Sequence, residues 1–417
     1  MKSEIIAIGS EMLTPFRQDT NSLALTGKLN SLGISVVFKT IVGDRRRDLV
    51  SAIRAALLRT DIVVLMGGLG PTEDDLTREA VAEALSITLR RDPDQVVALA
   101  ARAATWRIPM PTNNLKQADV LQGAIVLPNP NGSAPGQWLD VTYQGYRKLI
   151  MLIPGPPNEC CPLFDAECLP RLREVVPPRH MAKRTLRAAM IPESQADKLL
   201  APIYTTYTDV ETTILAHAGD IQLTLVCSKA NAALAQKRVD ELASRLETEI
   251  EDWLYSSGQD SADSLEQIVL YYLGLRQATL AIAESCTGGM ISQRITSVPG
   301  SSRGFLGGAV VYSDELKTHF AGVPPELIAR HGAVSSDVAE ALAYGIRRYT
   351  GATLGLGVTG IAGPSGATET KPVGLVYIAL SDEHKTESIE RTFKGDRDRI
   401  RQWATQQSLD LIRRRLR

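Results

Sequence analysis

Chemically capable side chains are concentrated in one turn of the C-terminal half. A strand expected over residues 279–283 runs directly into the sequence ESCTGG at residues 284–289, where a helix is expected to begin. A hydroxyl or thiol in such a turn lies beside unpaired backbone N–H groups, and an acyl-transfer nucleophile with its oxyanion hole requires that arrangement. Ser285 and Cys286 are both candidate nucleophiles.

A serine nucleophile needs a base, and the pattern places no histidine suitably. Lys317 lies one helical turn beyond the strand expected over residues 307–312, and it would serve as the base if burial kept its amine neutral. Tyr312, at the end of that strand, could orient or relay the proton. Judged by spacing alone, an N-cap serine, a packing cysteine and a solvated lysine are the more frequent explanation of these residues.

A second loop follows the strand expected over residues 354–358. Residues 355–360 formally match a dinucleotide-binding fingerprint, but glycines and prolines between residues 363 and 372 prevent the next segment from opening a helix. We therefore interpret residues 359–366 as a pocket-lining loop whose backbone N–H groups are available to a substrate.

Basic residues begin the last expected helix, over residues 397–414. Arg397 and Arg401 are four residues apart, so they share one helix face and could hold a phosphate. A solvated basic helix is the alternative, and we expect it to describe Arg399 and the tail residues 413–415.

A glycine-rich loop at residues 67–75, GGLGPTEDD, follows a buried strand expected over residues 61–66. Its glycines would let the backbone approach a ligand, and the helix expected over residues 76–85 directs free N–H groups toward the same point. A phosphate would fit there, with Thr72 donating its hydroxyl.

The acidic end of this loop admits two interpretations. Asp74 and Asp75 suit a divalent cation that bridges to the phosphate, because hard cations take carboxylate oxygens. Alternatively, the acids only stabilise the helix start and the glycines form a tight turn.

The elements that must position these residues alternate between strands and helices at both ends of the chain. Strands are expected over residues 5–8, 35–40, 61–66 and 148–153, with crossover helices between them. We predict an α/β protein: two three-layer α/β/α domains, residues 1–173 and 260–417, joined by a small α+β domain, residues 180–255. Pro177-Pro178 and the polar residues 256–261 are the expected linkers.

Composition excludes several classes of protein. The 417 residues are 44% hydrophobic and 22% charged, unlike disordered or fibrous chains, and a net charge of -1 creates no global field for nucleic acid or an anionic membrane. No apolar stretch approaches the roughly 18 residues of a spanning helix, so we expect a cytoplasmic protein. Five cysteines without CxxC spacing indicate neither a disulfide framework nor a zinc ribbon.

Taken together, these motifs resemble the CinA family of competence/damage-inducible proteins over essentially the whole chain. The N-terminal domain is similar to the molybdopterin-binding fold through residues 19–22, 67–75, 130–136 and 154–159. The resemblance implies an ADP-ribose pyrophosphatase that requires a divalent metal (Mg, Mn or Co), with K⁺ as a candidate monovalent ion. It implies metal binding by Asp44, Asp74 and Asp75. The implied substrate contacts are Gly9, Glu11, Asn21, Gly67, Gly68, Gly70, Thr72, Asn131 and Gly155.

The C-terminal domain resembles nicotinamide-nucleotide amidase through residues 283–289, residues 311–313 with Lys317, and residues 359–364. The resemblance implies that Ser285 is the nucleophile, Lys317 its base and Tyr312 an assistant. Backbone N–H groups near Gly288 and Gly289 would stabilise the oxyanion, and no cofactor is needed. The implied substrate contacts are Thr287, Gly288, Gly289, Thr359, Gly360, Ile361, Ala362, Gly363, Arg397 and Arg401.

We therefore expect hydrolysis of nicotinamide mononucleotide to nicotinate mononucleotide and ammonia, with ADP-ribose as the substrate of the second site, in pyridine nucleotide recycling. A homodimer without direct nucleic-acid or membrane partners is expected. The alternative is an N-terminal domain that only binds a pterin or nucleotide, or docks a competence-related partner. Residues 14–17 and the adjacent Cys160 and Cys161 depart from the pattern that the family leads us to expect.

Overall fold

The computed structural model describes residues 1–106, 111–177, 179–259 and 261–417. The chain divides into two compact units. One consists of Met1–Met181 with Ser228–Ala235, and the other of Ala182–Cys227 with Gln236–Arg417. Pro178 and Asp260, which belong to the two expected linkers, lie outside the described residues.

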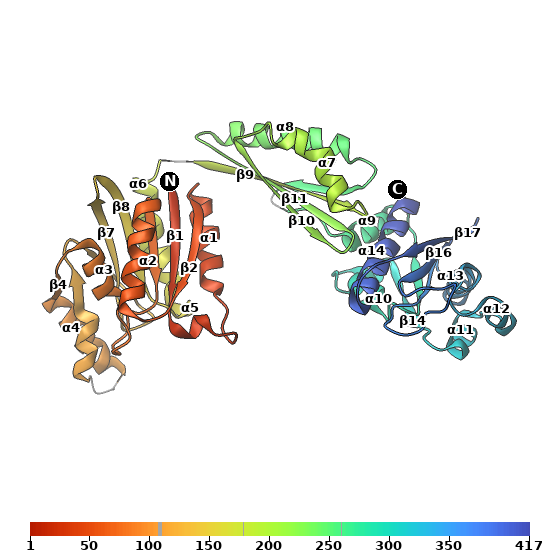
Figure 1. Ribbon diagram of the computed structural model, residues 1–417, viewed down its shortest axis with the longest axis horizontal. Helices are drawn as coiled ribbons and strands as arrows, with labels where there is room; N and C mark the ends of the chain where they lie inside the picture. Colours follow the sequence, from red (N-terminus) through yellow and green to blue (C-terminus); the bar gives the residue numbers. More distant parts are fainter. Residues whose placement is uncertain (107–110, 178, 260) are drawn as a thin grey trace. The chain divides into compact units, whose positions relative to one another are not determined.

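The N-terminal unit is built on a six-stranded sheet of order β2-β1-β3-β8-β7-β6 (Figure 1). The first four strands are parallel to one another, and β7 pairs antiparallel with both of its neighbours, β8 and β6. Parallel strands bring their C-terminal ends to one edge, which is where the glycine-rich loop begins. The strands are β1 (Lys2–Ile8), β2 (Ser35–Val42), β3 (Ile62–Met66), β6 (Ile125–Leu127), β7 (Gly136–Tyr143) and β8 (Tyr146–Ile153).

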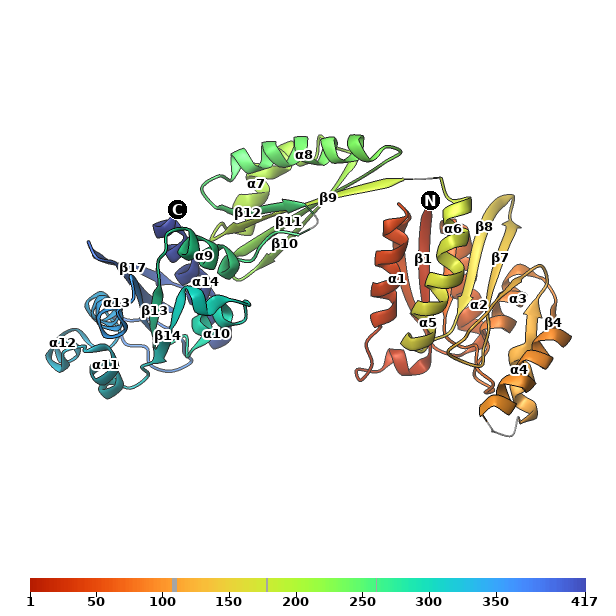
Figure 2. The ribbon, with the colours of Figure 1, turned by 180° about the vertical axis from the view of Figure 1, so that it is seen from behind.

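Helices cover both faces of this sheet because alternate strand residues point to opposite sides. Ile5 and Val64 pack into one buried cluster with α1, α5 and α6, whereas Ile6 and Val63 pack into a second cluster with α2 and α3 (Figures 1 and 2). The predicted three-layer arrangement is confirmed. The helices are α1 (Thr20–Ser31), α2 (Arg46–Arg59), α3 (Thr77–Leu85), α5 (Pro157–Leu163) and α6 (Leu169–Val175).

A small subdomain extends this unit. It contains α4 (Pro93–Trp106), the 3₁₀ segment Thr112–Ala118, and the antiparallel pair β4 (Leu89–Arg91) and β5 (Asp119–Leu121). Among the strands β4 to β8, the sequence predicts only β8. The strands β4, β5 and β6 are short, and β7 ends in polar residues, so they carry little periodic signal.

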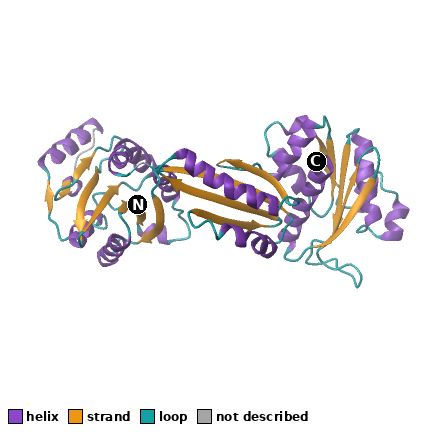
Figure 3. Ribbon diagram, turned by 90° about the horizontal axis from the view of Figure 1, so that it is seen from above, coloured by secondary structure: helices purple, strands orange, loops and turns teal. Residues whose placement is uncertain are grey.

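The middle of the chain forms a four-stranded sheet of order β10-β11-β9-β12 with two helices, α7 and α8 (Figure 3). The expected α+β character is confirmed. Its elements are β9 (His180–Ala189), α7 (Glu193–Tyr204), β10 (Val210–His217), β11 (Asp220–Lys229), α8 (Ala232–Glu249) and β12 (Leu254–Gln259).

One predicted linker is wrong. Residues 256–259 form most of β12 and pair antiparallel with β9, with Ser256 opposite Arg187 and Gln259 opposite Arg184. The sequence SSGQ is typical of a linker. Its backbone groups nevertheless form hydrogen bonds with a strand some 70 residues away in the chain, and local composition does not predict such a distant partner.

The C-terminal region holds a five-stranded sheet of order β14-β13-β15-β16-β17. β13 runs parallel to β14 and β15, and β16 pairs antiparallel with both of its neighbours, β15 and β17. Helices α9, α10 and α14 pack with the residues of one face, and α11 and α13 with those of the other. The strands are β13 (Leu280–Glu284), β14 (Phe305–Val310), β15 (Leu354–Gly360), β16 (Leu375–Ser381) and β17 (Thr386–Thr392). The helices are α9 (Leu265–Leu275), α10 (Met290–Thr296), α11 (Asp314–Ala321), α12 (Pro325–His331), α13 (Ser336–Thr350) and α14 (Arg397–Leu416).

The rejected dinucleotide fingerprint has a packing role. Residues 361–374 contain no helix, and β16 begins at Leu375. A Cβ added to Gly357 would lie 2.3 Å from the Ala339 carbonyl oxygen, so the glycine lets α13 approach β15 closely.

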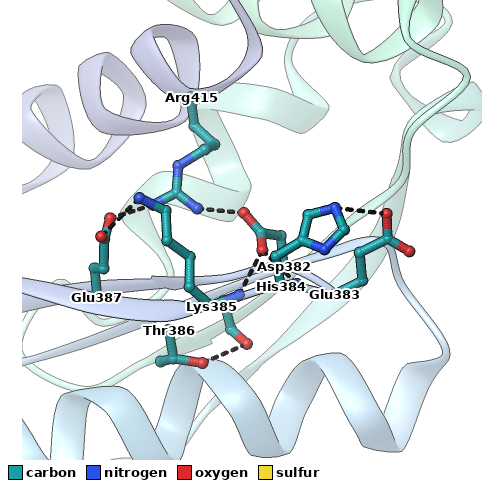
Figure 4. Close-up of polar contacts among 8 residues, drawn as sticks. Asp382, Glu383, His384, Lys385, Thr386, Glu387 and Arg415 are labelled. Atoms are coloured by element: carbon teal, nitrogen blue, oxygen red, sulfur yellow. Dashed lines mark hydrogen bonds and ion pairs between the residues drawn. The ribbon is translucent and has the colours of Figure 1, made fainter.

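The basic tail of α14 is solvated only in part, because Arg414 is 45% exposed but its two neighbours are not. The Arg413 side chain is 2% exposed and its Nη2 lies 2.7 Å from Asp410 Oδ1. Arg415 contacts Asp382 and Glu387 at the turn between β16 and β17, as Figure 4 shows. In sequence, a run of arginines is typical of a solvated helix face. Here each arginine of residues 413–415 donates hydrogen bonds to a carboxylate or to a backbone carbonyl.

Candidate functional sites

Three loops meet at the C-terminal edge of the second α/β sheet. The register pairs Glu284 of β13 with Val310 of β14 and with Val358 of β15. Directly beyond these pairs, the Ser285 amide donates to the Val358 carbonyl at 3.0 Å, and the Val311 amide donates to the Glu284 carbonyl at 2.8 Å. Ser285 therefore lies between the strand ends that carry residues 311–312 and 359–360.

The polar groups of this edge are buried. Ser285 is 8% exposed, Lys317 2% and Thr359 1%. Lys317 Nζ lies 3.2 Å from both the Tyr312 carbonyl oxygen and Asp314 Oδ1. The structure thus brings the Lys317 amine to the backbone of Tyr312, at the same sheet edge as Ser285.

The first turns of α14 clamp these loops together. Arg397 donates from Nη1 to the Gly363 carbonyl at 2.9 Å and from Nη2 to the Tyr312 hydroxyl at 3.0 Å. Arg401 donates to the Thr287 carbonyl from Nη2 at 2.9 Å and from Nε at 3.2 Å. Two arginines expected to hold a phosphate therefore also hold protein groups from all three loops. Each guanidinium has five donors, so the contacts leave donors over for a ligand.

The two candidate nucleophiles differ in environment. Desolvation by burial raises the pKa of the Cys286 thiol to about 12, so it stays protonated near neutral pH. A protonated thiol is a poor nucleophile. Cys286 therefore lacks the thiolate that a cysteine nucleophile uses.

The expected oxyanion donors are only partly available. The Gly288 N–H donates to the Ser285 carbonyl at 3.1 Å, so the turn itself uses this proton and the expectation for Gly288 needs correction. The Gly289 N–H has no acceptor among the residues that the structure describes, and it remains a candidate donor.

Glu284 is a residue that the sequence reasoning missed. Its carboxylate, 1% exposed, accepts from the Ile291 amide at 3.1 Å and from the Ser292 amide and hydroxyl at 2.9 and 2.7 Å. It therefore satisfies free donors at the start of α10 and fixes the turn that presents Ser285. The sequence does contain a signal for this role, because an acidic residue directly precedes a glycine-containing turn and a helix.

The N-terminal unit contains a cavity of about 630 Å³ at the C-terminal ends of β1, β3 and β8. Six of the nine predicted substrate-binding residues line it: Glu11, Asn21, Gly67, Gly68, Gly70 and Gly155. Asn21 also ties α1 to the opposite rim, because its Nδ2 donates to the Gly155 carbonyl at 2.7 Å.

Thr72 does not line the cavity. Its amide donates to Asp75 Oδ2 at 2.9 Å and its hydroxyl donates to the same oxygen, so both donors serve the loop rather than a phosphate. A Cβ on Gly70 would lie 2.4 Å from Asp75 Oδ2, so the glycine makes room for this carboxylate. The predicted phosphate contact of Thr72 stays a prediction, and it would require Thr72 to exchange Asp75 for the ligand.

Gly9 and Asn131 also lie outside the lining. Gly9 flanks it, between Ile8 and Glu11, whereas the Asn131 amide donates to the Asn158 carbonyl at 2.8 Å. The donor is the side-chain Nδ2 of Asn131 and the acceptor belongs to α5, so this bond joins two separate segments, and the predicted substrate contact of Asn131 stays a prediction.

The three predicted metal ligands are not gathered at one point. Asp75 lines the cavity, but Asp44 accepts from the Ser10 amide at 2.7 Å, and Asp74 is exposed. Within the described ranges, no group of three or more His, Cys, Asp or Glu residues could hold a metal ion. The side chains therefore fit a divalent ion only where substrate oxygens complete its coordination.

Several cavity residues were not predicted. Gln117 is 2% exposed, its Nε2 donates to the Ser133 hydroxyl at 3.1 Å, and its Oε1 is buried without a partner. Arg17 is the one basic side chain among the described residues that line the cavity. Asp19 and Glu159 line it too. No local pattern marks Gln117, which belongs to a short 3₁₀ segment.

Three family models match the chain. A probable molybdopterin binding domain matches residues 4–174, a damage-inducible protein CinA KH domain matches residues 183–256, and a CinA C-terminal domain matches residues 262–416. Together they define a CinA-type arrangement around the two sites.

Full-length relatives agree. A CinA-like protein from Acidobacterium capsulatum is 63% identical over 416 residues, and one from Koribacter versatilis is 53% identical; each match covers 100% of both chains. The solved structure of a competence or damage-inducible protein from Enterobacter asburiae is 31% identical, covers 37% of this chain and 96% of its own, and has a TM-score of 0.36. The chain belongs to the CinA family.

The KH match by itself is weak support for nucleic-acid binding by this region. KH domains hold nucleotides with a GXXG loop, whereas residues 183–256 contain a single glycine, Gly219. This stretch therefore lacks the loop by which KH domains clamp a nucleic-acid backbone. In the described residues, no helix combines the length and the apolar character needed to span a membrane.

Proposed function

We propose that the C-terminal site hydrolyses the carboxamide of nicotinamide mononucleotide. The observation that carries the proposal is the clamp of Arg397 and Arg401, which holds the loops of Ser285, Tyr312 and Gly363 at one edge beside buried Lys317. A buried hydroxyl, a buried amine and two guanidinium groups are the parts that amide hydrolysis of an anionic nucleotide requires.

The reaction follows from these groups. The Ser285 hydroxyl attacks the carboxamide carbon while the Lys317 amine, when uncharged, takes its proton. The tetrahedral oxyanion is stabilised by backbone donors such as the Gly289 N–H. The carbon–nitrogen bond then breaks, the lysine returns the proton, and ammonia leaves. Water hydrolyses the acyl-enzyme by the same proton path, giving nicotinate mononucleotide and free Ser285.

The arginines have two tasks in this proposal. Their bonds to Tyr312, Gly363 and Thr287 keep the loops in register, and their remaining donors bind the substrate phosphate. The test is ammonia release from nicotinamide mononucleotide by the purified full chain. Release of ammonia together with nicotinate mononucleotide supports the proposal, and intact substrate after prolonged incubation rejects it.

For the N-terminal cavity we propose hydrolysis of ADP-ribose between its phosphates. Asp75 and Glu11 line the cavity and would hold a divalent ion together with the substrate phosphates. Such an ion, Mg, Mn or Co, would neutralise phosphate charge when bound. Arg17 would offset the remaining negative charge, and Asn21 would keep the rim in place.

The competing proposal is that this domain only binds a pterin or nucleotide, or docks a partner in competence. Binding and turnover of ADP-ribose, measured separately with and without metal, distinguish the two. Metal-dependent AMP formation that is lost in Asp75→Ala supports catalysis; binding without turnover supports the alternative. Within the same proposal, the protein works in the cytoplasm as a homodimer.

A further inference from the structure

The first two residues of α3 hold the glycine-rich loop of the N-terminal cavity by its carbonyl groups. Thr77 donates from its hydroxyl to the Gly67 carbonyl at 2.7 Å and from its amide to the carbonyl of the next residue at 3.2 Å. Arg78 donates from Nη1 and Nη2 to the carbonyls of the two residues that follow, Leu69 and Gly70, at 3.0 and 3.2 Å. Four successive carbonyl groups of the loop therefore face the start of α3.

These bonds direct the N–H groups of the loop the other way. In a planar trans peptide the carbonyl and the N–H point in opposite directions, so the N–H groups of Gly68, Leu69 and Gly70 point away from α3. None of the three has an acceptor within the described part of the chain. All three residues line the cavity. Successive free N–H groups of this kind form a concavity that binds anions.

Arg78 places a buried positive charge on the side of the loop opposite these donors. Its side chain is 0% exposed, and burial lowers the pKa of the guanidinium because the charge is removed from water. The carboxylates of Asp75, Glu79 and Asp119 act on this pKa in the opposite direction, but each of them bonds another group. A buried charge without a paired carboxylate is costly, and an anion bound across the loop would offset part of that cost.

A role in packing alone does not account for this pattern. All four bonds from α3 lie on one side of the loop, and the residues that the structure describes supply no acceptor on the other side. Unpaired backbone N–H groups are costly in a folded protein, so three adjacent ones beside a cavity indicate a ligand that pairs with them.

We propose that Thr77 and Arg78 are positioning residues of the N-terminal site, whose bonds hold the N–H groups of residues 68–70 toward the cavity, where these groups bind a diphosphate. This inference rests on the proposed hydrolysis of ADP-ribose and assigns the affinity for the diphosphate to the loop backbone. Binding of the diphosphate then does not require the divalent ion.

Calorimetry of the full chain with inorganic pyrophosphate in EDTA tests the proposal. Arg78→Lys keeps the charge but loses the planar fork of donors, and Thr77→Val keeps the shape but loses the hydroxyl. Arg90→Lys is the matched control, because Arg90 is exposed on β4 and lies outside the loop. The thermal unfolding midpoint of each chain is measured with and without pyrophosphate.

We expect Arg78→Lys to bind pyrophosphate about tenfold more weakly than the wild-type chain, and Thr77→Val about threefold more weakly. Arg90→Lys should bind it normally. The rise of the unfolding midpoint on adding pyrophosphate should shrink in the same order. A merely structural role would lower the midpoint of the ligand-free variants and leave their pyrophosphate affinity unchanged. That result would overturn the proposal, as would a wild-type chain that does not bind pyrophosphate in EDTA.

ADP-ribose turnover with Mg²⁺ separates this inference from the proposed hydrolysis. If pyrophosphate affinity depends on Arg78 but the wild-type chain never forms AMP, the positioning role stands and the pyrophosphatase proposal falls. If AMP forms and both variants bind pyrophosphate normally, only the positioning role falls.

Discussion

The two candidate sites occupy the same place in two similar sheets, the C-terminal edge of parallel strands, but they are built differently. The N-terminal site is a roomy cavity in which glycines make space for carboxylates such as Asp75. At the C-terminal site, side chains from one helix bind the backbone of the loops that carry Thr287 and Gly363. The first arrangement leaves space beside carboxylates, whereas the second joins three loops through two guanidinium groups.

The helix that closes the C-terminal site is itself anchored at its far end. Arg413 Nη1 donates to the Leu254 carbonyl at 3.3 Å, and Arg414 Nη2 donates to the Asp252 carbonyl at 3.0 Å. Gly219 of the middle region lies against Trp403 and Gln406 near the centre of α14. The middle region and the C-terminal sheet thus share α14, and the C-terminal site depends on more of the chain than its loops.

The largest effect should follow removal of the nucleophile. Ser285→Ala is expected to lower ammonia release from nicotinamide mononucleotide by at least about a thousandfold, because no other group forms the acyl-enzyme. Cys286→Ser is the matched control next to it and should retain most of the rate. ADP-ribose turnover by Ser285→Ala should be unchanged. The reverse result for the two variants would transfer the nucleophile to Cys286.

Removal of Arg413, which anchors the end of α14, should lower the stability of the C-terminal unit and leave that of the N-terminal unit unchanged. Arg413 and Asp410 are both almost fully buried, and Asp410 keeps Arg414 as a second partner, so the loss of Arg413 costs up to the value of about 3–5 kcal/mol for a broken buried pair. Arg413→Ala is expected to lower the free energy of unfolding of the C-terminal unit by that amount, measured by urea denaturation. The exposed Arg399→Ala on the same helix is the control. Equal destabilisation of the N-terminal unit would contradict the separation.

The turn of residues 284–289 was predictable because a strand, two glycines and a helix follow one another within a dozen residues. Spacing alone favours a solvated lysine at position 317, and only the family resemblance implies a base there; the structure buries this side chain, which is 2% exposed. By contrast, Gln117 pairs with Ser133, which lies in another loop, and Arg413 reaches the distant Leu254 carbonyl besides its neighbour Asp410. Their local sequence does not indicate burial. For Thr72, sequence does not rank two local partners, a phosphate and Asp75, and the structure shows the contact with Asp75.

Loss of a clamp arginine should have a smaller effect. Arg397→Met removes two hydrogen bonds from a charged group, each contributing about 1.5–3 kcal/mol. We expect kcat/KM for nicotinamide mononucleotide to fall by about 10- to 100-fold, since the loops lose register and the phosphate loses a donor. Arg399→Met, two residues away and exposed, should be near normal. Tyr312→Phe removes one of the two bonds and should fall between them; an unimpaired Arg397→Met would remove the clamp from the mechanism.

The smallest expected effect concerns Cys286. Burial raises the pKa of its thiol to about 12, so the reactive thiolate appears only as the pH approaches that value. Iodoacetamide at about pH 8 should therefore leave ammonia release unchanged, while the less buried Cys161 reacts. Mass spectrometry of the labelled chain checks which cysteine carries the label. Rapid inactivation with label on Cys286 would mean that the turn opens in solution, and the C-terminal site would then be as accessible as the N-terminal cavity.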